Sequence, residues 1–151
     1  MKQQIIAVAN EKGGVAKTTT VISLGGALAQ AGQEVLLIDL DAQSNLSLGL
    51  GVDPSRVRRS IADVLLNSGS LLSVSRETSI PGLDLVPANP DMGLAERFLP
   101  VRQNYELILK NALRNHPTIS AYQFILLDCP PSLGAVTTNA LSAADFVIAP
   151  T

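Results

Sequence analysis

A short apolar run that leads directly into two glycines and then into a helical pattern is the feature that most constrains this chain. Residues 5–9 (IIAVA) predict a buried strand, and residues 10–20 follow with the sequence NEKGGVAKTTT. Glycines let backbone N–H groups approach an anion, and the start of the next helix adds positive charge. This order predicts a phosphate-binding loop, in which Lys17 faces the β- and γ-phosphates and the Thr18 hydroxyl ligates Mg²⁺.

The loop departs from the usual Walker A pattern GxxxxGK[ST]. That pattern requires glycine at positions 11 and 16, where this chain has Glu11 and Ala16. The sequence present is KGGVAKTT, with a second lysine, Lys12, at the front of the loop. An ordinary Gly-Gly turn with two solvated lysines is the alternative interpretation, and the flanking strand and helix patterns disfavour it.

Two further apolar runs end in aspartate. Residues 34–41 (EVLLIDLD) end in Asp39 and Asp41, and residues 123–128 (QFILLD) end in Asp128. Continuous apolar runs are typical of parallel strands that are covered on both faces. Each aspartate alone could simply begin a turn. Acids at the ends of two buried strands, together with a phosphate loop after a third, predict a Mg²⁺–phosphate site at the carboxyl edge of a parallel sheet.

These three segments together resemble the ParA/MinD family of deviant Walker A P-loop ATPases. The loop KGGVAKT matches the deviant Walker A motif, LIDLDAQ at residues 37–43 resembles Walker A′ and switch I, and LLDCPPSLG at residues 126–134 resembles Walker B and switch II. The resemblance covers residues 3–151 and is greatest to the ParA (Soj-like) DNA-partitioning ATPases. The apolar run at the end of the chain indicates the N-terminal part of such a protein.

The resemblance implies a slow ATP hydrolase that uses ATP and Mg²⁺ and is stimulated by a partner. Lys12 would act across a dimer interface, Lys17 would bind phosphate, and Asp41 would orient the attacking water. Thr18 would ligate Mg²⁺ directly, with Asp39 and Asp128 acting through water. The expected phosphate-binding residues are Lys12, Gly13, Gly14, Val15, Ala16, Lys17, Thr18 and Thr19.

The same resemblance implies partners. It predicts an ATP-dependent homodimer, a ParB-type partner protein and, in a full-length context, nonspecific DNA. The cargo could be a plasmid, a chromosome or another body. A MinD-like division regulator would need a basic amphipathic membrane helix, which the sequence does not show. An iron–sulfur relative would need at least two cluster cysteines per subunit. A truncated remnant that binds nucleotide weakly stays open.

We expect an α/β fold with a mainly parallel sheet and helices on both faces, in a single P-loop ATPase domain over residues 1–151 that is incomplete at its C-terminus. The predicted strands are residues 3–9, 34–39, 83–87, 122–128 and 145–150. The predicted helices are residues 18–31, 60–67, 91–99, 101–115 and 135–143. Ser60 is the expected cap of its helix, Gly25-Gly26 allows close packing on the sheet, and residues 42–54 are expected to form a mobile switch loop.

Composition excludes several classes. No apolar run approaches about 18 residues, and no signal peptide is evident, so we expect a cytoplasmic protein. The single Cys129 cannot form an internal disulfide and is expected to be a packing residue. The net charge is −2, and the basic cluster of Arg56, Arg58 and Arg59 is interpreted as ordinary surface. His116 is expected to be solvated or capping. We expect weak DNA binding and self-association of this chain.

Overall fold

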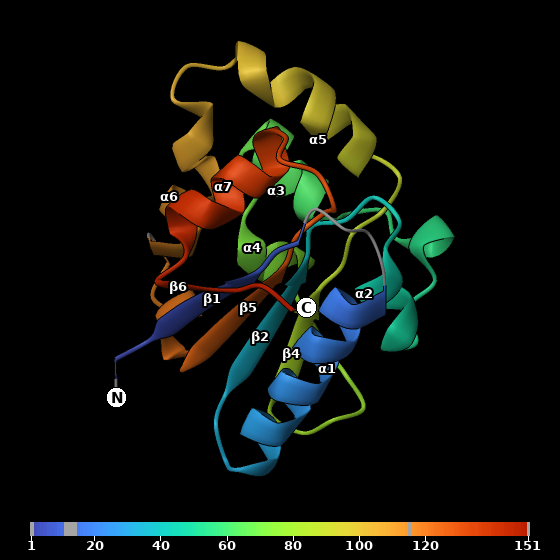
Figure 1. The fold of residues 1–151 in the computed structure, drawn as a ribbon, viewed down its shortest axis with the longest axis vertical. Coiled ribbons are helices and arrows are strands. Elements are labelled where there is room, and N and C mark those ends of the chain that lie inside the picture. Colours follow the sequence, from blue (N-terminus) through green and yellow to red (C-terminus); the bar gives the residue numbers. More distant parts are fainter. Residues whose placement is uncertain (1, 11–14, 115, 151) are drawn as a thin grey trace.

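The computed structural model describes residues 2–10, 15–114 and 116–150. Within these ranges it contains a six-stranded sheet in the order β3-β4-β2-β5-β1-β6 (Figure 1). All neighbouring strands are parallel except β3 and β4, which are antiparallel. The strands are β1 (Gln4–Val8), β2 (Val35–Asp39), β3 (Arg76–Glu77), β4 (Leu83–Val86), β5 (Phe124–Asp128) and β6 (Phe146–Ile148). The predicted α/β fold with a mainly parallel sheet is therefore confirmed.

The register of the central strands aligns the ends that carry the predicted site. Val8 at the end of β1 pairs with Asp128 at the end of β5, and Asp128 in turn pairs with Asp39 at the end of β2. Three segments far apart in the sequence therefore leave the sheet side by side. Ligands of open α/β sheets bind at this carboxyl edge.

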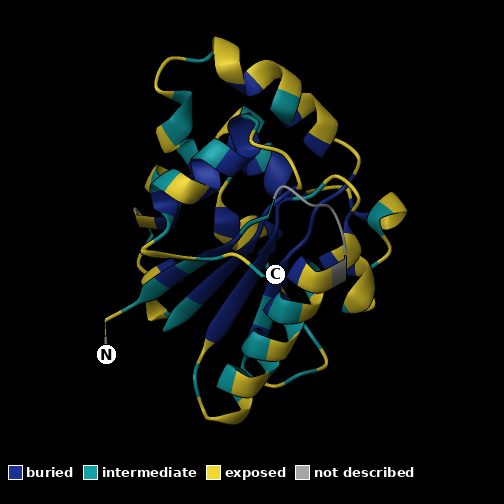
Figure 2. Ribbon diagram, viewed as in Figure 1, coloured by how far each residue is buried: buried dark blue, intermediate teal, exposed yellow. Residues whose placement is uncertain are grey.

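Helices cover both faces of the sheet, as the continuous apolar strands require. On one face lie α1 (Val15–Gln30) and α2 (Asn45–Gly49), and this side of the core includes Val21, Val35, Leu37 and Leu126. On the other face lie α3 (Ile61–Asn67), α4 (Leu71–Val74), α5 (Met92–Phe98), α6 (Ile108–Arg114) and α7 (Ala135–Ala143). Figure 2 shows the strands buried between these layers and the outer helix surfaces exposed.

Several local predictions are confirmed. The Ser60 hydroxyl accepts from the Ala62 N–H at 3.1 Å, and Asp63 Oδ2 accepts from the Ser60 N–H at 2.8 Å, which completes the capping box of α3. Gly25 is needed for close packing, since a Cβ there would lie 2.8 Å from Leu37 Cδ2. Gly26 has open space beside it, so only the first glycine of the pair serves this purpose.

The predicted helix over residues 101–115 is confirmed only for its second half, α6, and is wrong for residues 101–107. The chain instead forms η2 (Leu99–Val101), η3 (Tyr105–Leu107) and α6. Asn104 adopts a left-handed conformation (φ 55°), which interrupts the helix, and Val101 is 81% exposed rather than packed. Between them, Arg102 Nη1 donates to the carbonyl oxygens of Leu65 and Leu66 at the end of α3, at 2.7 and 3.1 Å.

Other elements were absent from the sequence prediction. Residues 42–54, predicted as a loop, contain α2 and the first residue of η1 (Pro54–Arg56). The short α4, η4 (Ile119–Ala121) and β3 were also missed; β3 is two exposed residues long and shows no apolar alternation. β6 forms the opposite edge of the sheet, with Phe146 and Val147 more than half exposed. None of the helices in the described ranges is long and apolar enough to cross a bilayer.

Candidate functional site

The predicted phosphate loop leads from β1 into the start of α1. Val15, Ala16, Lys17, Thr18 and Thr19 are the first five residues of α1. None of the residues in that first turn is acidic, and the start of a helix carries partial positive charge. The expected phosphate ligands Lys12, Gly13 and Gly14 lie outside the described residues.

Lys17 is an almost completely buried cation. The residue is 3% exposed, and Nζ donates to the carbonyl oxygen of Asn10, two residues after the end of β1, at 3.1 Å. Burial of an ammonium group is unfavourable unless polar atoms replace water around it. The fold therefore buries this charge at the start of α1, against the backbone that follows β1.

Thr18 contacts the carboxylate that was expected to share its metal ion. The Thr18 hydroxyl donates to Asp128 Oδ2 at 2.9 Å, although the two residues are 110 positions apart. α1 supplies the hydroxyl and the end of β5 supplies the carboxylate. The structure thus brings together one hydroxyl and one carboxylate that the sequence assigned to the same site.

Asp39 is buried and is hydrogen-bonded to Ser47 on α2, within the 42–54 segment that was predicted as a switch loop. Its Oδ2 accepts from the Ser47 N–H at 3.0 Å and from the Ser47 hydroxyl at 2.7 Å. The Ser47 hydroxyl also accepts from the Ala88 N–H at 3.2 Å. One side chain on α2 therefore links the end of β2 to the segment that follows β4. The sequence analysis missed Ser47 because it is one of several polar residues in a stretch interpreted as a loop.

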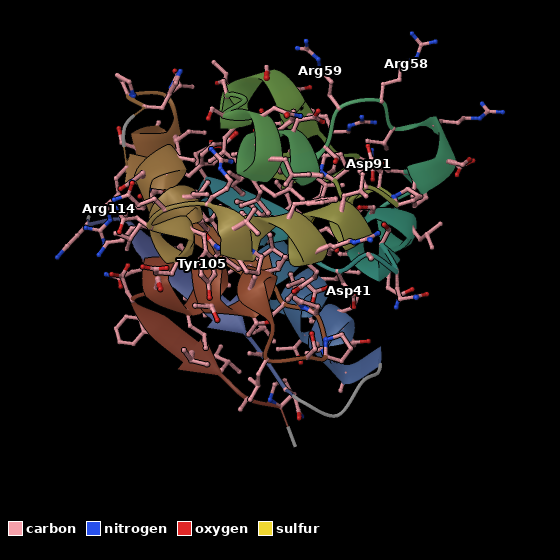
Figure 3. The ribbon with its side chains drawn as sticks, turned by 90° about the horizontal axis from the view of Figure 1, so that it is seen from above. Asp41, Arg58, Arg59, Asp91, Tyr105 and Arg114 are labelled. Carbon is pink, nitrogen blue, oxygen red and sulfur yellow. The ribbon has the colours of Figure 1, made fainter. Side chains whose placement is uncertain are left out.

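Asp41 lies at the rim of the site rather than inside it. Its N–H donates to Asp39 Oδ1 at 3.1 Å, and its own Oδ1 accepts from the Gln43 N–H at 3.0 Å. Figure 3 shows Asp41 near the blue ribbon of α1. One carboxylate oxygen, Oδ2, is left without a protein donor in the described part of the chain, so it can accept from water.

Burial dominates the electrostatics of the two inner aspartates. Desolvation raises the pKa of Asp39 to about 6, in spite of the hydrogen bonds from Ser47. Desolvation also raises the pKa of Asp128 to about 7; the Thr18 hydrogen bond opposes this, and the charges of Asp39 and Asp41 add to it. Negative charge is therefore disfavoured at both positions, and a bound cation would reverse this.

These residues fit a hydrated Mg²⁺ ion bound together with phosphate. Mg²⁺ takes oxygen ligands and is usually held by one or two carboxylates plus substrate phosphates, with several waters retained. Thr18, Asp39 and Asp128 supply such oxygens. Within residues 2–10, 15–114 and 116–150, no group of three or more His, Cys, Asp or Glu side chains could hold a metal ion alone. The arrangement therefore matches a shared site better than a dedicated metal cage.

Glu96 on α5 is a second residue that sequence reasoning missed. Its two carboxylate oxygens accept from the N–H groups of Ala135 at 3.0 Å and Val136 at 3.2 Å, at the start of α7. The N-cap residue Gly134 has no side chain to do this, and a Cβ there would collide with Glu96. The carboxylate therefore fixes the end of the 126–134 segment from a different element. The role of Glu96 becomes visible only in the structure, where α5 contacts the start of α7.

Cys129 and His116 have the roles expected of them. Cys129 is buried, and desolvation raises the pKa of its thiol to about 12, which does not favour a reactive thiolate. His116 Nδ1 accepts from the Thr118 N–H at 3.2 Å, a local capping contact. Neither residue joins the site.

Comparison with known proteins agrees with this geometry. The family AAA_31, an AAA domain, matches residues 3–151. The chromosome partitioning protein ParA of Caulobacter vibrioides is 43% identical over 147 residues, which cover 97% of this chain and 55% of that protein. The sporulation initiation inhibitor protein Soj of Bacillus subtilis is 41% identical over 147 residues, covering 97% of this chain and 57% of that protein. The chain thus spans little more than half the length of these relatives.

Solved structures show the same fold. Cobyrinic acid a,c-diamide synthase from Mycobacterium smegmatis, solved with an ATP analog and magnesium, superposes with a TM-score of 0.93 and 44% identity, covering 99% of this chain and 60% of that one. A putative plasmid partition protein from Borrelia burgdorferi, bound to AMPPNP, superposes with a TM-score of 0.81 and 28% sequence identity. The match covers 99% of this chain and 63% of that one. The chain therefore belongs to the AAA_31 family of AAA domains and is a ParA-type member of the deviant Walker A P-loop ATPases.

Proposed function

We propose that residues 1–151 form a P-loop ATPase domain that binds and hydrolyses ATP in a partitioning system. The observation that carries this proposal is the meeting of Thr18 and Asp128 next to the buried Lys17, at the edge where β1, β2 and β5 end. The family and its nucleotide-bound relatives support it.

In this proposal the site residues bind and orient the phosphates and Mg²⁺ through their positions and charges. Lys17 exchanges the Asn10 carbonyl for phosphate oxygens, and the backbone N–H groups of residues 13–19 hold the phosphates at the helix end. Thr18 would ligate Mg²⁺ directly, and Asp39 and Asp128 would hold its water ligands. When bound, the ion would supply positive charge that offsets the negative charge of the phosphates.

Asp41 is the residue proposed to orient the attacking water. It lies two residues beyond Asp39, on the switch segment, with one carboxylate oxygen available to accept a proton or hydrogen bond. Catalysis of this kind depends on positioning and electrostatic stabilisation and needs no covalent intermediate. Lys12 is proposed to reach the phosphates of a second subunit, which would add positive charge in the transition state.

The wider cycle is part of the same proposal. Two subunits close face to face around two ATP molecules, and the ATP-bound dimer holds DNA nonspecifically in a full-length context. A ParB-type partner stimulates hydrolysis and releases the dimer. The relatives named ParA and Soj support this assignment. The proposal includes a cytoplasmic location, with association with the nucleoid in a full-length context.

The experiment that tests the proposal measures mass and phosphate release together. Light scattering coupled to size exclusion, run with ATP, with ADP and without nucleotide, should show a dimer only with ATP, most clearly for Asp41→Ala. Phosphate release should require Mg²⁺ and Lys17. A folded chain that gives the same mass in all three conditions and releases no phosphate would contradict the proposal.

A further inference from the structure

Arginine side chains gather at the β3 edge of the sheet, far from the nucleotide site. Arg56, Arg58, Arg59 and Arg76 line a groove of about 490 Å³ with Ser73, Val74 and Ser75. An adjoining hollow of about 300 Å³ shares Arg56 and Arg76. We call the two together the arginine groove. It contains four of the chain's eleven lysines and arginines, although the net charge is −2.

The positive charge of the arginine groove is largely uncompensated. Among the described residues the one ion pair joins Arg56 to Asp53 at 3.8 Å, and both side chains are mostly exposed. Such an exposed ion pair contributes little to stability, and salt screens the attraction between its charges. Figure 3 shows Arg58 and Arg59 pointing away from the molecule.

The acid nearest in sequence to Arg76 does not neutralise it. Glu77 follows Arg76 in β3, and neighbouring residues of a strand point to opposite faces. Glu77 instead pairs with Asp84 on β4, whose Oδ2 accepts a hydrogen bond from the Tyr122 hydroxyl. Arg76 therefore faces the groove without a carboxylate of its own.

Apolar side chains lie beneath this cationic rim. Val57 and Val74 are buried, and Val52 contributes to the adjoining hollow. Arg76, the first residue of β3, lines both hollows, and β3 is the last strand in the sheet order, with no second neighbouring strand in the described ranges. A peptide in extended conformation can place alternate side chains in pockets beside such an edge.

We propose that the arginine groove binds an acidic, extended segment of a partner protein, with carboxylates on the guanidinium groups and small apolar residues on the valines. Guanidinium groups bind carboxylates through two parallel hydrogen bonds, which favours arginine over lysine at such a surface. The arginine groove contains none of the predicted nucleotide-site residues, but its adjoining hollow includes Gly51, Val52 and Asp53 from the 42–54 segment.

Nucleic acid fits the groove less well. Duplex affinity grows with the number of phosphates neutralised, and strong nonspecific binding uses about 6–10 contacts spread along the backbone. Here only four arginines line the groove, and none of the lining residues is aromatic, so the lining offers no ring that could stack on a base.

The test is fluorescence anisotropy with a labelled peptide of alternating glutamate and valine at about physiological salt. A lysine–valine peptide and a labelled DNA duplex serve as comparison probes. The wild-type chain should bind the acidic peptide and neither of the others strongly. Because each reversed arginine removes a charge-assisted contact, the triple variant R58E/R59E/R76E should weaken acidic-peptide binding at least about tenfold.

A matched variant controls for net charge. K2E/K110E/R114E changes the charge by the same amount on other parts of the surface and should alter peptide affinity less than about twofold. If the triple reversal disturbs folding, the single variants R58Q and R59Q, at exposed positions, should each weaken binding about two- to fivefold. Circular dichroism checks that each variant is folded.

Three results would overturn the inference. The acidic peptide could fail to bind the folded wild type, or both charge-reversal variants could lose binding equally, which would indicate net charge alone. Alternatively, the duplex could bind more tightly than the peptide and lose that binding with R58E/R59E/R76E, which would identify a nucleic-acid surface instead.

Discussion

Replacing Glu96 should loosen the start of α7 by a predictable amount. The carboxylate accepts two backbone hydrogen bonds, at 3.0 and 3.2 Å, at a helix N-terminus whose cap residue is glycine. A net hydrogen bond to a charged group contributes about 1.5–3 kcal/mol, and loss of a helix N-cap costs about 1 kcal/mol. Because both bonds share one half-buried carboxylate, we expect Glu96→Ala to lower the free energy of unfolding by about 2–3 kcal/mol.

Urea titration followed by circular dichroism measures this loss, and thermal unfolding gives a second reading. For a chain of this size each kcal/mol lowers the midpoint temperature by about 2–4 °C, so we expect a decrease of about 4–12 °C. Glu96→Gln keeps one acceptor oxygen but loses the charge, and its loss of stability should be intermediate.

The control is Glu77→Ala, which removes an exposed carboxylate with no hydrogen bond in the described part of the chain. Its effect should stay within about 0.5 kcal/mol. If Glu96→Ala were no more destabilising than Glu77→Ala, the carboxylate would not hold α7, and the contact between α5 and α7 would have to rest on apolar packing alone.

The remaining predictions concern the nucleotide site. Lys17→Ala should abolish ATP binding in a filter-binding assay without unfolding the chain, and unchanged affinity would refute its role. Asp41→Ala should keep ATP binding but stop phosphate release; continued release at the wild-type rate would place the catalytic carboxylate elsewhere. Ser47→Ala leaves Asp39 and a backbone N–H short of a partner and should cost about 1–3 kcal/mol by urea titration, whereas a loss under about 0.5 kcal/mol would mean that water replaces the hydroxyl. Because burial raises the folded-state pKa values of Asp39 (to about 6) and Asp128 (to about 7) above the ordinary value of 3.8, the stabilisation by their protonated forms is fully present below about pH 4 and is lost as the pH rises through 6 and 7. The ligand-free chain should therefore unfold more easily at pH 8 than at pH 5, and Asp128→Asn should flatten this dependence; a stability that rises over this range would contradict it.

Features encoded locally could be predicted from the sequence. The strand ends that carry Asp39 and Asp128 follow from two apolar runs, and the capping box at Ser60 follows from a four-residue pattern. Chain topology then requires the carboxyl ends of parallel strands to meet at one edge. The proximity of Thr18 to Asp128 could therefore be predicted from the sequence, but the length of the hydrogen bond between them could not.

Features that depend on distant contacts could not be predicted. The helix expected over residues 101–115 has a suitable apolar period, but Asn104 in a left-handed conformation and Arg102 bound to the end of α3 interrupt it. Ser47 and Glu96 are ordinary polar residues in sequence, and only the fold brings them to Asp39 and to α7. The edge strand β3 forms because its two residues pair with β4 in antiparallel orientation.

The most direct test of the account is calorimetric titration of the chain with a non-hydrolysable ATP analogue, with and without Mg²⁺. The convergence of Lys17, Thr18 and Asp128 predicts saturable binding that Mg²⁺ strengthens. Lys17→Ala should remove the binding, and Asp128→Asn should remove most of the effect of Mg²⁺. A folded wild-type chain that binds no nucleotide, or binds it equally well with and without Mg²⁺, would contradict the assignment of this edge of the sheet as the nucleotide site.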